Sequence, residues 1–165
     1  MSLTTHPYHF FSDIKAFMNV WGKSLGKLMD EKILCVWGVW DTENKTWFDV
    51  APMLIELTSV TLSVHVKCEK DLAIGWNDIL LSDKPVWFDE EQNRQMPDLK
   101  WQENLIWKEY DLVEKAFGNT IKNTVPLQSD YGLTGIAFSL DDDITLSIYD
   151  AGDVIAAKCE WNKEE

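Results

Sequence analysis

Aspartate is the residue of this chain whose type and spacing come nearest to a chemical motif. Asp141, Asp142 and Asp143 stand in a row, Asp150 and Asp153 follow, and no basic residue lies among them. Carboxylates of one loop could bind Ca²⁺, and two carboxyls in a cleft could serve as acid and base in glycoside hydrolysis. The triplet lacks the alternating ligands and distal Glu of a helix–loop–helix calcium site. Asp also forms turns and keeps sheet edges soluble, which is the simpler interpretation.

The histidines and cysteines give no metal or nucleophile motif; they are His6, His9, His65, Cys35, Cys68 and Cys159. His65 and Cys68 fall on opposite faces of a predicted strand, so one metal ion cannot easily bind both. A Cys–His pair would need Cys35 or Cys159 beside His65. Three cysteines in apolar, strand-like surroundings predict buried, reduced thiols of a cytoplasmic protein. With no phosphate loop or nucleophile elbow either, we expect no enzyme, no cofactor and no metal.

Tryptophan is abundant, with nine residues, three of them near one predicted hairpin: Trp37, Trp40 and Trp47. Trp in apolar strands is usually core, and we assign Trp37 and Trp76 to packing. Trp87 and Trp101 are better surface candidates, because carboxylates flank them, including Asp89, Glu90 and Glu91. An aromatic anchor rimmed by carboxylates suits a cationic groove on a protein.

The negative charge is concentrated in the second half of the chain. Residues 1–82 carry 7 Lys and 10 Asp or Glu, whereas residues 83–165 carry 8 Lys or Arg and 18 Asp or Glu, and the net charge is −13. Such a field repels nucleic acid and anionic membranes and attracts cationic partners. Charged residues interrupt every apolar run before the length of a membrane span, and no secretory signal is visible, so we expect a cytoplasmic protein.

The first half of the chain predicts one helix followed by strands. Ser12 is a good N-cap for a helix whose apolar residues recur at helical spacing, namely Ile14, Phe17, Met18, Trp21, Leu25 and Leu28. Residues 33–40 are apolar nearly throughout, as in a central strand, and residues 47–50 return as a hairpin. Residues 54–68 predict a strand with one wet face and a bulge or bend near residues 58–59.

The second half predicts a loop, a short helix and a meander. Residues 83–98 hold two prolines and a polar run, and residues 110–117 suit a short helix. Three strands at residues 133–140, 144–149 and 154–161 are joined by tight turns. We therefore expect a single α+β domain over residues 1–165, in which a mainly antiparallel curved sheet carries the first helix, with residues 1–10 as a poorly ordered tail.

The run from Gly135 to Asp153, a strand, an acidic turn and a second strand, resembles the endings of small bacterial immunity proteins that guard against polymorphic toxins. The resemblance covers a small part of the chain and carries over no functional residue.

These observations lead to a non-enzymatic binding module that docks its acidic side on a basic protein, with a toxin-neutralising immunity protein as the most specific version. The expected partner-binding residues are Trp87, Asp89, Glu90, Glu91, Trp101, Asp141, Asp142 and Asp143. The first alternative is a small-molecule or carbohydrate binder that uses exposed Trp side chains. The second is a hydrolase with a carboxylate pair of opposed pKa shifts.

Overall fold

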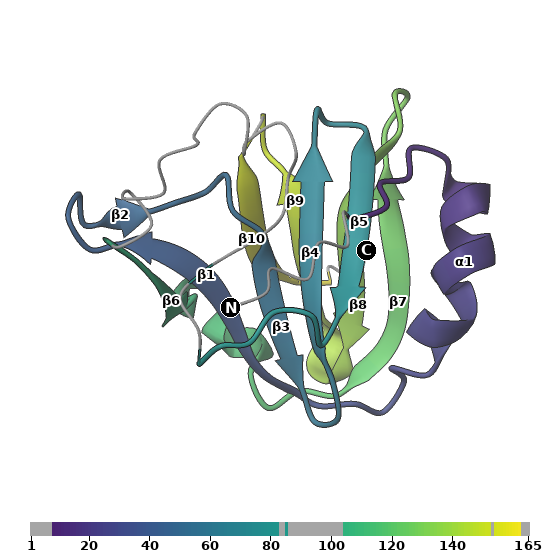
Figure 1. Ribbon diagram of the computed structural model, residues 1–165. Coiled ribbons are helices and arrows are strands. Elements are labelled where there is room, and N and C mark those ends of the chain that lie inside the picture. The colour runs from purple at the N-terminus through teal and green to yellow at the C-terminus, as the bar shows by residue number, and fades with distance from the viewer. Residues whose placement is uncertain (1–7, 83–84, 86–103, 153, 163–165) are drawn as a thin grey trace.

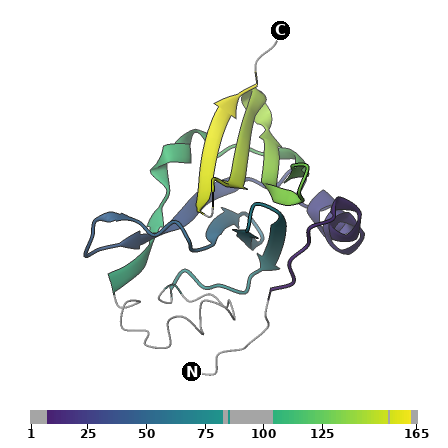
Figure 2. The ribbon, with the colours of Figure 1, turned by 90° about the horizontal axis from the view of Figure 1, so that it is seen from above.

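The strands form two antiparallel sheets that face each other (Figures 1 and 2). The computed structural model describes residues 8–82, 85, 104–152 and 154–162. Over these residues, an antiparallel α+β fold with one α-helix is confirmed, and its strands divide between two sheets. Within the described residues, no helix is long and apolar enough to cross a membrane.

The first sheet has the order β2-β1-β3-β4-β5, and β6 also pairs with β1. Its strands are β1 (Ile33–Asp41), β2 (Thr46–Trp47), β3 (Met53–Leu57), β4 (Thr61–Lys67), β5 (Asp71–Trp76) and β6 (Leu105–Glu109). Trp37 pairs with both Leu54 and Glu109, and Trp40 pairs with both Trp47 and Ile106. Strand β6 therefore follows one edge of β1, while β3 and then β2 follow the other edge.

The second sheet has the order β10-β9-β8-β7. Its strands are β7 (Ile121–Gln128), β8 (Leu133–Leu140), β9 (Ile144–Asp150) and β10 (Ile155–Trp161). The predicted C-terminal meander of three strands is confirmed. Strand β7 contains Pro126, which cannot donate to a ladder and is tolerated because β7 is an edge strand with β8 as its partner in the sheet.

The hydrophobic core lies between the sheets and is closed at both open sides. Strands β4 and β8 contribute alternate residues such as Val64 and Phe138, both fully buried. Helix α1 (Ile14–Gly26) stands beside β5 and β7 (Figure 1), with Phe17 fully buried. On the other side, the 3-10 helix η2 (Asp111–Ala116) contacts β1, β9 and β10 and buries Val113.

Several local expectations are corrected by the structure. The N-cap of α1 is Asp13 and not Ser12, because the Asp13 carboxylate accepts a hydrogen bond from Ala16 N at 2.9 Å. Of the bulge or bend expected near residues 58–59, the structure has a bend, and it divides the expected strand into β3 and β4. The short helix expected over residues 110–117 is present as a 3-10 helix at residues 111–116, with a non-helical residue at Val113.

The expected burial of β4 is also corrected. His65, predicted on a wet face, is only 6% exposed, and its neighbour Ser63 is fully buried. Cys68, predicted as a buried strand residue, is exposed in the turn after β4 with a φ of 57°. The second face of β4 is therefore covered, and the strand reaches solvent only at its end.

Candidate functional site

The expected acidic turn, Asp141–Asp143, forms the 3-10 helix η3 between β8 and β9. Asp141 has a structural role, because its Oδ1 accepts from Thr120 N at 2.9 Å and its own N donates to Thr120 O at 3.1 Å. Asp142 and Asp143 are exposed at φ values of 60° and 56°, a conformation that Asp tolerates better than most residues. Turn formation therefore explains this triplet.

The acidic residues of the terminal meander do not form one patch. Asp143 directly precedes β9, whereas Asp150 is its last residue, so the two lie roughly 20 Å apart at about 3.3 Å per residue. The Asp150 carboxylate accepts hydrogen bonds from Glu69 N and Gly152 N, which joins two turns. The other expected binding residues lie outside the described residues, namely Trp87, Asp89, Glu90, Glu91 and Trp101.

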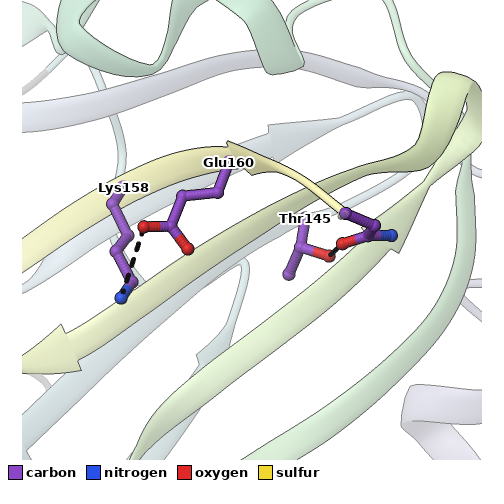
Figure 3. Close-up of polar contacts among 4 residues, drawn as sticks. Thr145, Lys158 and Glu160 are labelled. Carbon is purple, nitrogen blue, oxygen red and sulfur yellow. Dashed lines mark hydrogen bonds and ion pairs between the residues drawn. The ribbon is translucent and has the colours of Figure 1, made fainter. Parts of the chain in front are cut away.

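The outer face of the second sheet carries polar groups that satisfy one another (Figure 3). Lys158 Nζ lies 3.7 Å from Glu160 Oε1, and Thr145 Oγ1 donates to Asn162 Oδ1 at 2.6 Å. Both charged side chains are about half exposed or more, so this ion pair contributes little. Nothing in this arrangement points to a reaction.

A polar cluster, in which Ser63 and His65 are buried and Asp78 is exposed, lies on the outer face of the first sheet. His65 Nε2 is 2.9 Å from Ser63 Oγ, which donates to Asp78 Oδ1 at 3.1 Å. The Tyr8 ring lies against the His65 ring at 3.6 Å between centroids. Burial lowers the pKa of His65 to about 3, and burial followed by the Asp78 carboxylate raises the pKa of Tyr8. His65 is therefore neutral over the physiological range.

This cluster does not have the geometry of a nucleophilic triad. In such a triad the histidine lies between the serine and the carboxylate, whereas here Ser63 lies between His65 and Asp78. Cys35 is not activated either: burial, followed by the charges of Glu109 and Glu56, raises its pKa to about 12. Among the described residues, no group of three or more His, Cys, Asp or Glu side chains could hold a metal ion.

Gly75 makes the polar cluster possible and gives a first testable prediction. Gly75 pairs with Ser63, and a Cβ at this position would lie 2.4 Å from both Ser63 Oγ and Asp78 Oδ2. We expect Gly75→Ala to lower the free energy of unfolding by about 1–3 kcal/mol in urea titrations, as overpacking does. Gly26→Ala is the matched control, because nothing lies within 4 Å of its Cβ position. Equal stabilities for the two variants would contradict a tightly filled cluster.

A second group of side chains lies on a three-stranded extension of the first sheet, here called the aromatic arm: residues 37–41 of β1 with β2 and β6 (Figure 1). The rings of Trp40 and Trp47 lie 5.0 Å apart at 79°, and those of Trp47 and Tyr110 lie 4.7 Å apart at 55°. Gly38 lies beneath them, because a Cβ there would be 3.1 Å from Trp47 and 3.2 Å from Tyr110. All three rings are half-buried.

The arm borders a cavity of about 230 Å³, here called the aromatic cleft. It opens between the end of β2 and the start of β3, which pair with the same edge of β1. Its walls are residues 38–39 and 46–47, most of segment 48–53, Tyr110, and residues 154–156 at the start of β10. Ile155 N donates to Asp49 O at 2.6 Å, which fixes this segment to the second sheet. The cleft therefore joins the two sheets at one side of the molecule.

The charge around the cleft is mainly negative. The exposed Asp49 lines the cavity, and Asp111 follows Tyr110 directly. Burial, followed by Tyr149, Asp49 and Asp111, raises the pKa of Tyr110. Lys108 is the neighbouring cation, and its Nζ lies 3.8 Å from the centre of the Trp40 ring. An aromatic cavity with a carboxylate at its wall can hold a cationic group.

No family model, curated protein or solved structure matches this chain. The geometry of the site is therefore the basis on which a function can be argued.

Sequence reasoning missed the residues of the aromatic cleft. The sequence shows the cluster of Trp37, Trp40 and Trp47, but it assigns Trp37 to packing and gives Trp40 and Trp47 no role. Trp76 does pack against the core, whereas Trp37 is half-buried and its Nε1 donates to Glu56 Oε1 at 3.2 Å. Trp40 faces the other side of the arm, because the parity of β1 places it with Gly38, and Trp47 of β2 pairs with Trp40 on that side. This parity, together with the position of Asp49 just after the hairpin, is the signal in the sequence that could have indicated the aromatic cleft.

Proposed function

We propose that the chain is a non-enzymatic binding module that docks on a basic protein through the aromatic cleft. The observation that carries the proposal is the presence of Trp47, Tyr110 and Asp49 around one cavity of a chain with a net charge of −13. Aromatic anchors in a pocket contribute much of the binding energy of protein interfaces. The surplus of carboxylates steers a cationic partner toward this surface and accelerates association.

The most specific version of this proposal is an immunity protein that neutralises a bacterial toxin in the cytoplasm. Toxins that cleave nucleic acid need basic substrate clefts, and an acidic protein can block such a cleft by charge complementarity. The resemblance of residues 135–153 to the endings of immunity proteins supports this version. The exposed Asp142 and Asp143, and the expected residues Trp87, Asp89, Glu90, Glu91 and Trp101, stay candidates for further contacts.

Affinity capture followed by kinetics tests the proposal. The immobilised chain is exposed to extract of the source cell at low and high salt, and each protein retained by the wild type but lost from Trp47→Ala is then purified. We expect a basic protein whose association rate constant falls at least about tenfold from low to physiological salt. We also expect Trp47→Ala and Asp49→Asn each to raise its Kd about tenfold.

Two variants distant from the cleft serve as controls for this measurement. Trp161→Ala removes an exposed Trp at the end of β10, and Asp130→Asn removes an exposed carboxylate between β7 and β8. Neither is expected to change the Kd. A partner whose association ignores ionic strength, or whose Kd responds equally to Trp161→Ala and Trp47→Ala, would overturn the proposal.

A second candidate function, binding of a carbohydrate, is favoured by the contiguous rings of Trp40, Trp47 and Tyr110. Sugars stack on such rings through their apolar faces. A panel of mono- and oligosaccharides, titrated against Trp fluorescence at high salt, separates the two functions. A sugar-dependent change in Trp fluorescence that Trp47→Ala abolishes would support carbohydrate binding. If no sugar changed the fluorescence, carbohydrate binding would be contradicted and docking on a basic protein would be favoured.

A further inference from the structure

We propose that the aromatic cleft binds the guanidinium of an arginine side chain on the basic partner. This inference rests on the proposed function, since it names the group by which that partner is held. It combines three properties of one cavity: an aromatic wall, a carboxylate beside it, and a volume suited to a single side chain.

The rings of the aromatic arm already hold one cation. Lys108 Nζ lies 3.8 Å from the ring centre of Trp40 and 5.6 Å from that of Trp47. A cation over an aromatic face is attracted by the quadrupole of the ring, most strongly over Trp. Because Trp47 also lines the cavity, a cation that enters the cavity meets the same kind of surface.

The carboxylate of Asp49 favours arginine over lysine. Asp49 is exposed and lines the same cavity as Trp47 and Tyr110. A guanidinium is planar, stacks on aromatic rings and donates two parallel hydrogen bonds to one carboxylate. A lysine ammonium is a compact and strongly hydrated point charge, so it gains less from such a wall.

The size of the cavity favours a side chain over a larger ligand. Sites for drug-sized molecules usually occupy about 300–1,000 Å³, whereas the cleft has a volume of about 230 Å³. Its walls come from both sheets, and Ile155 N holds the Asp49 segment in place. A cleft of this size can accept one long side chain from a partner that covers its mouth.

An NMR titration of the full chain tests the inference with acetyl-Gly-Arg-Gly-amide as the probe. We expect the largest shifts at the amides of Gly38, Trp47, Asp49 and Ile155. We also expect the arginine probe to bind about fivefold or more tightly than its neutral citrulline analogue, with the lysine analogue between them. Equal binding of arginine and citrulline peptides, or shifts centred elsewhere, would overturn the inference.

Matched variants connect the effect to the cleft. Asp49→Asn is expected to reduce the affinity for the arginine probe nearly to that for the citrulline analogue, whereas Asp130→Asn leaves it unchanged. Trp47→Leu, checked for folding by circular dichroism, is expected to weaken the arginine probe as well. A basic partner that binds in a salt-dependent manner while the probe stays out of the cleft refutes this inference alone. A probe that enters the cleft of a chain that retains no basic protein refutes the proposed function alone.

Discussion

Acidification from pH 7 to pH 4 is expected to lower the free energy of unfolding by about 3 kcal/mol through His65 alone. Burial lowers the pKa of this histidine to about 3 in the folded chain, against an ordinary value of 6.5. The unfolded chain therefore binds a proton at His65 from pH 6.5 downwards, while the folded chain does not. The stability is lost as the pH falls from 6.5 to about 3, and the loss then levels off.

The physical cause is the enclosure of the imidazole on the outer face of the first sheet. The Tyr8 ring lies against the His65 ring, and Ser63 Oγ lies 2.9 Å from His65 Nε2. A protonated ring would be a buried charge without a carboxylate at hydrogen-bond distance, since Asp78 contacts Ser63 and not His65 among the described contacts. Burial of this charge therefore opposes protonation of His65 in the folded chain.

Urea titrations between pH 7 and pH 4 measure the effect. His65→Gln and His65→Phe should show a shallower fall of stability with pH than the wild type, by about 1.4 kcal/mol per pH unit below pH 6. The exposed His9 supplies the matched control, and His9→Gln is titrated alongside the His65 variants. Parallel curves for the wild type and both His65 variants would disprove burial of a neutral His65.

The fold could be predicted from the sequence where periodicity is strong. The helical spacing of Phe17, Trp21 and Leu25 and the alternation along residues 133–161 led to α1 and the meander. The division into two sheets could not be predicted, because sheet membership depends on pairings distant in sequence, such as that of β1 with β6. Strand β7 was missed because Pro126 reads as a strand breaker unless its position at an edge is known.

The candidate site was harder to predict than the fold. Alternation along β4 correctly separated Val64 from His65, but it could not show that both faces of the strand are covered. Composition indicated carboxylates as binding residues, yet the Asp141 carboxylate accepts a hydrogen bond from Thr120 N and has a structural role. The aromatic cleft lies between β2 and β3, which pair with successive parts of the same edge of β1. A single sequence carries no direct signal of such a gap between two strands.

Phe17→Ala is expected to lower the free energy of unfolding by about 3–5 kcal/mol, the largest effect of a single truncation considered for this chain. Phe17 is fully buried, and its ring meets that of Phe11 edge to face at 5.8 Å between centroids. It lies on α1, which covers the side of the core between β5 and β7. The substitution leaves a cavity there, and urea unfolding at pH 7 measures the loss.

The matched control is Val20→Ala on the same helix, since Val20 is 53% exposed. It is expected to change the stability by less than about 0.5 kcal/mol, because Ala favours helix and little apolar surface is lost. The comparison separates packing of α1 on the core from its intrinsic helix propensity. If Phe17→Ala cost no more than Val20→Ala, then α1 would not seal the core. In that case the two sheets alone would have to supply the marginal stability typical of a domain of this size.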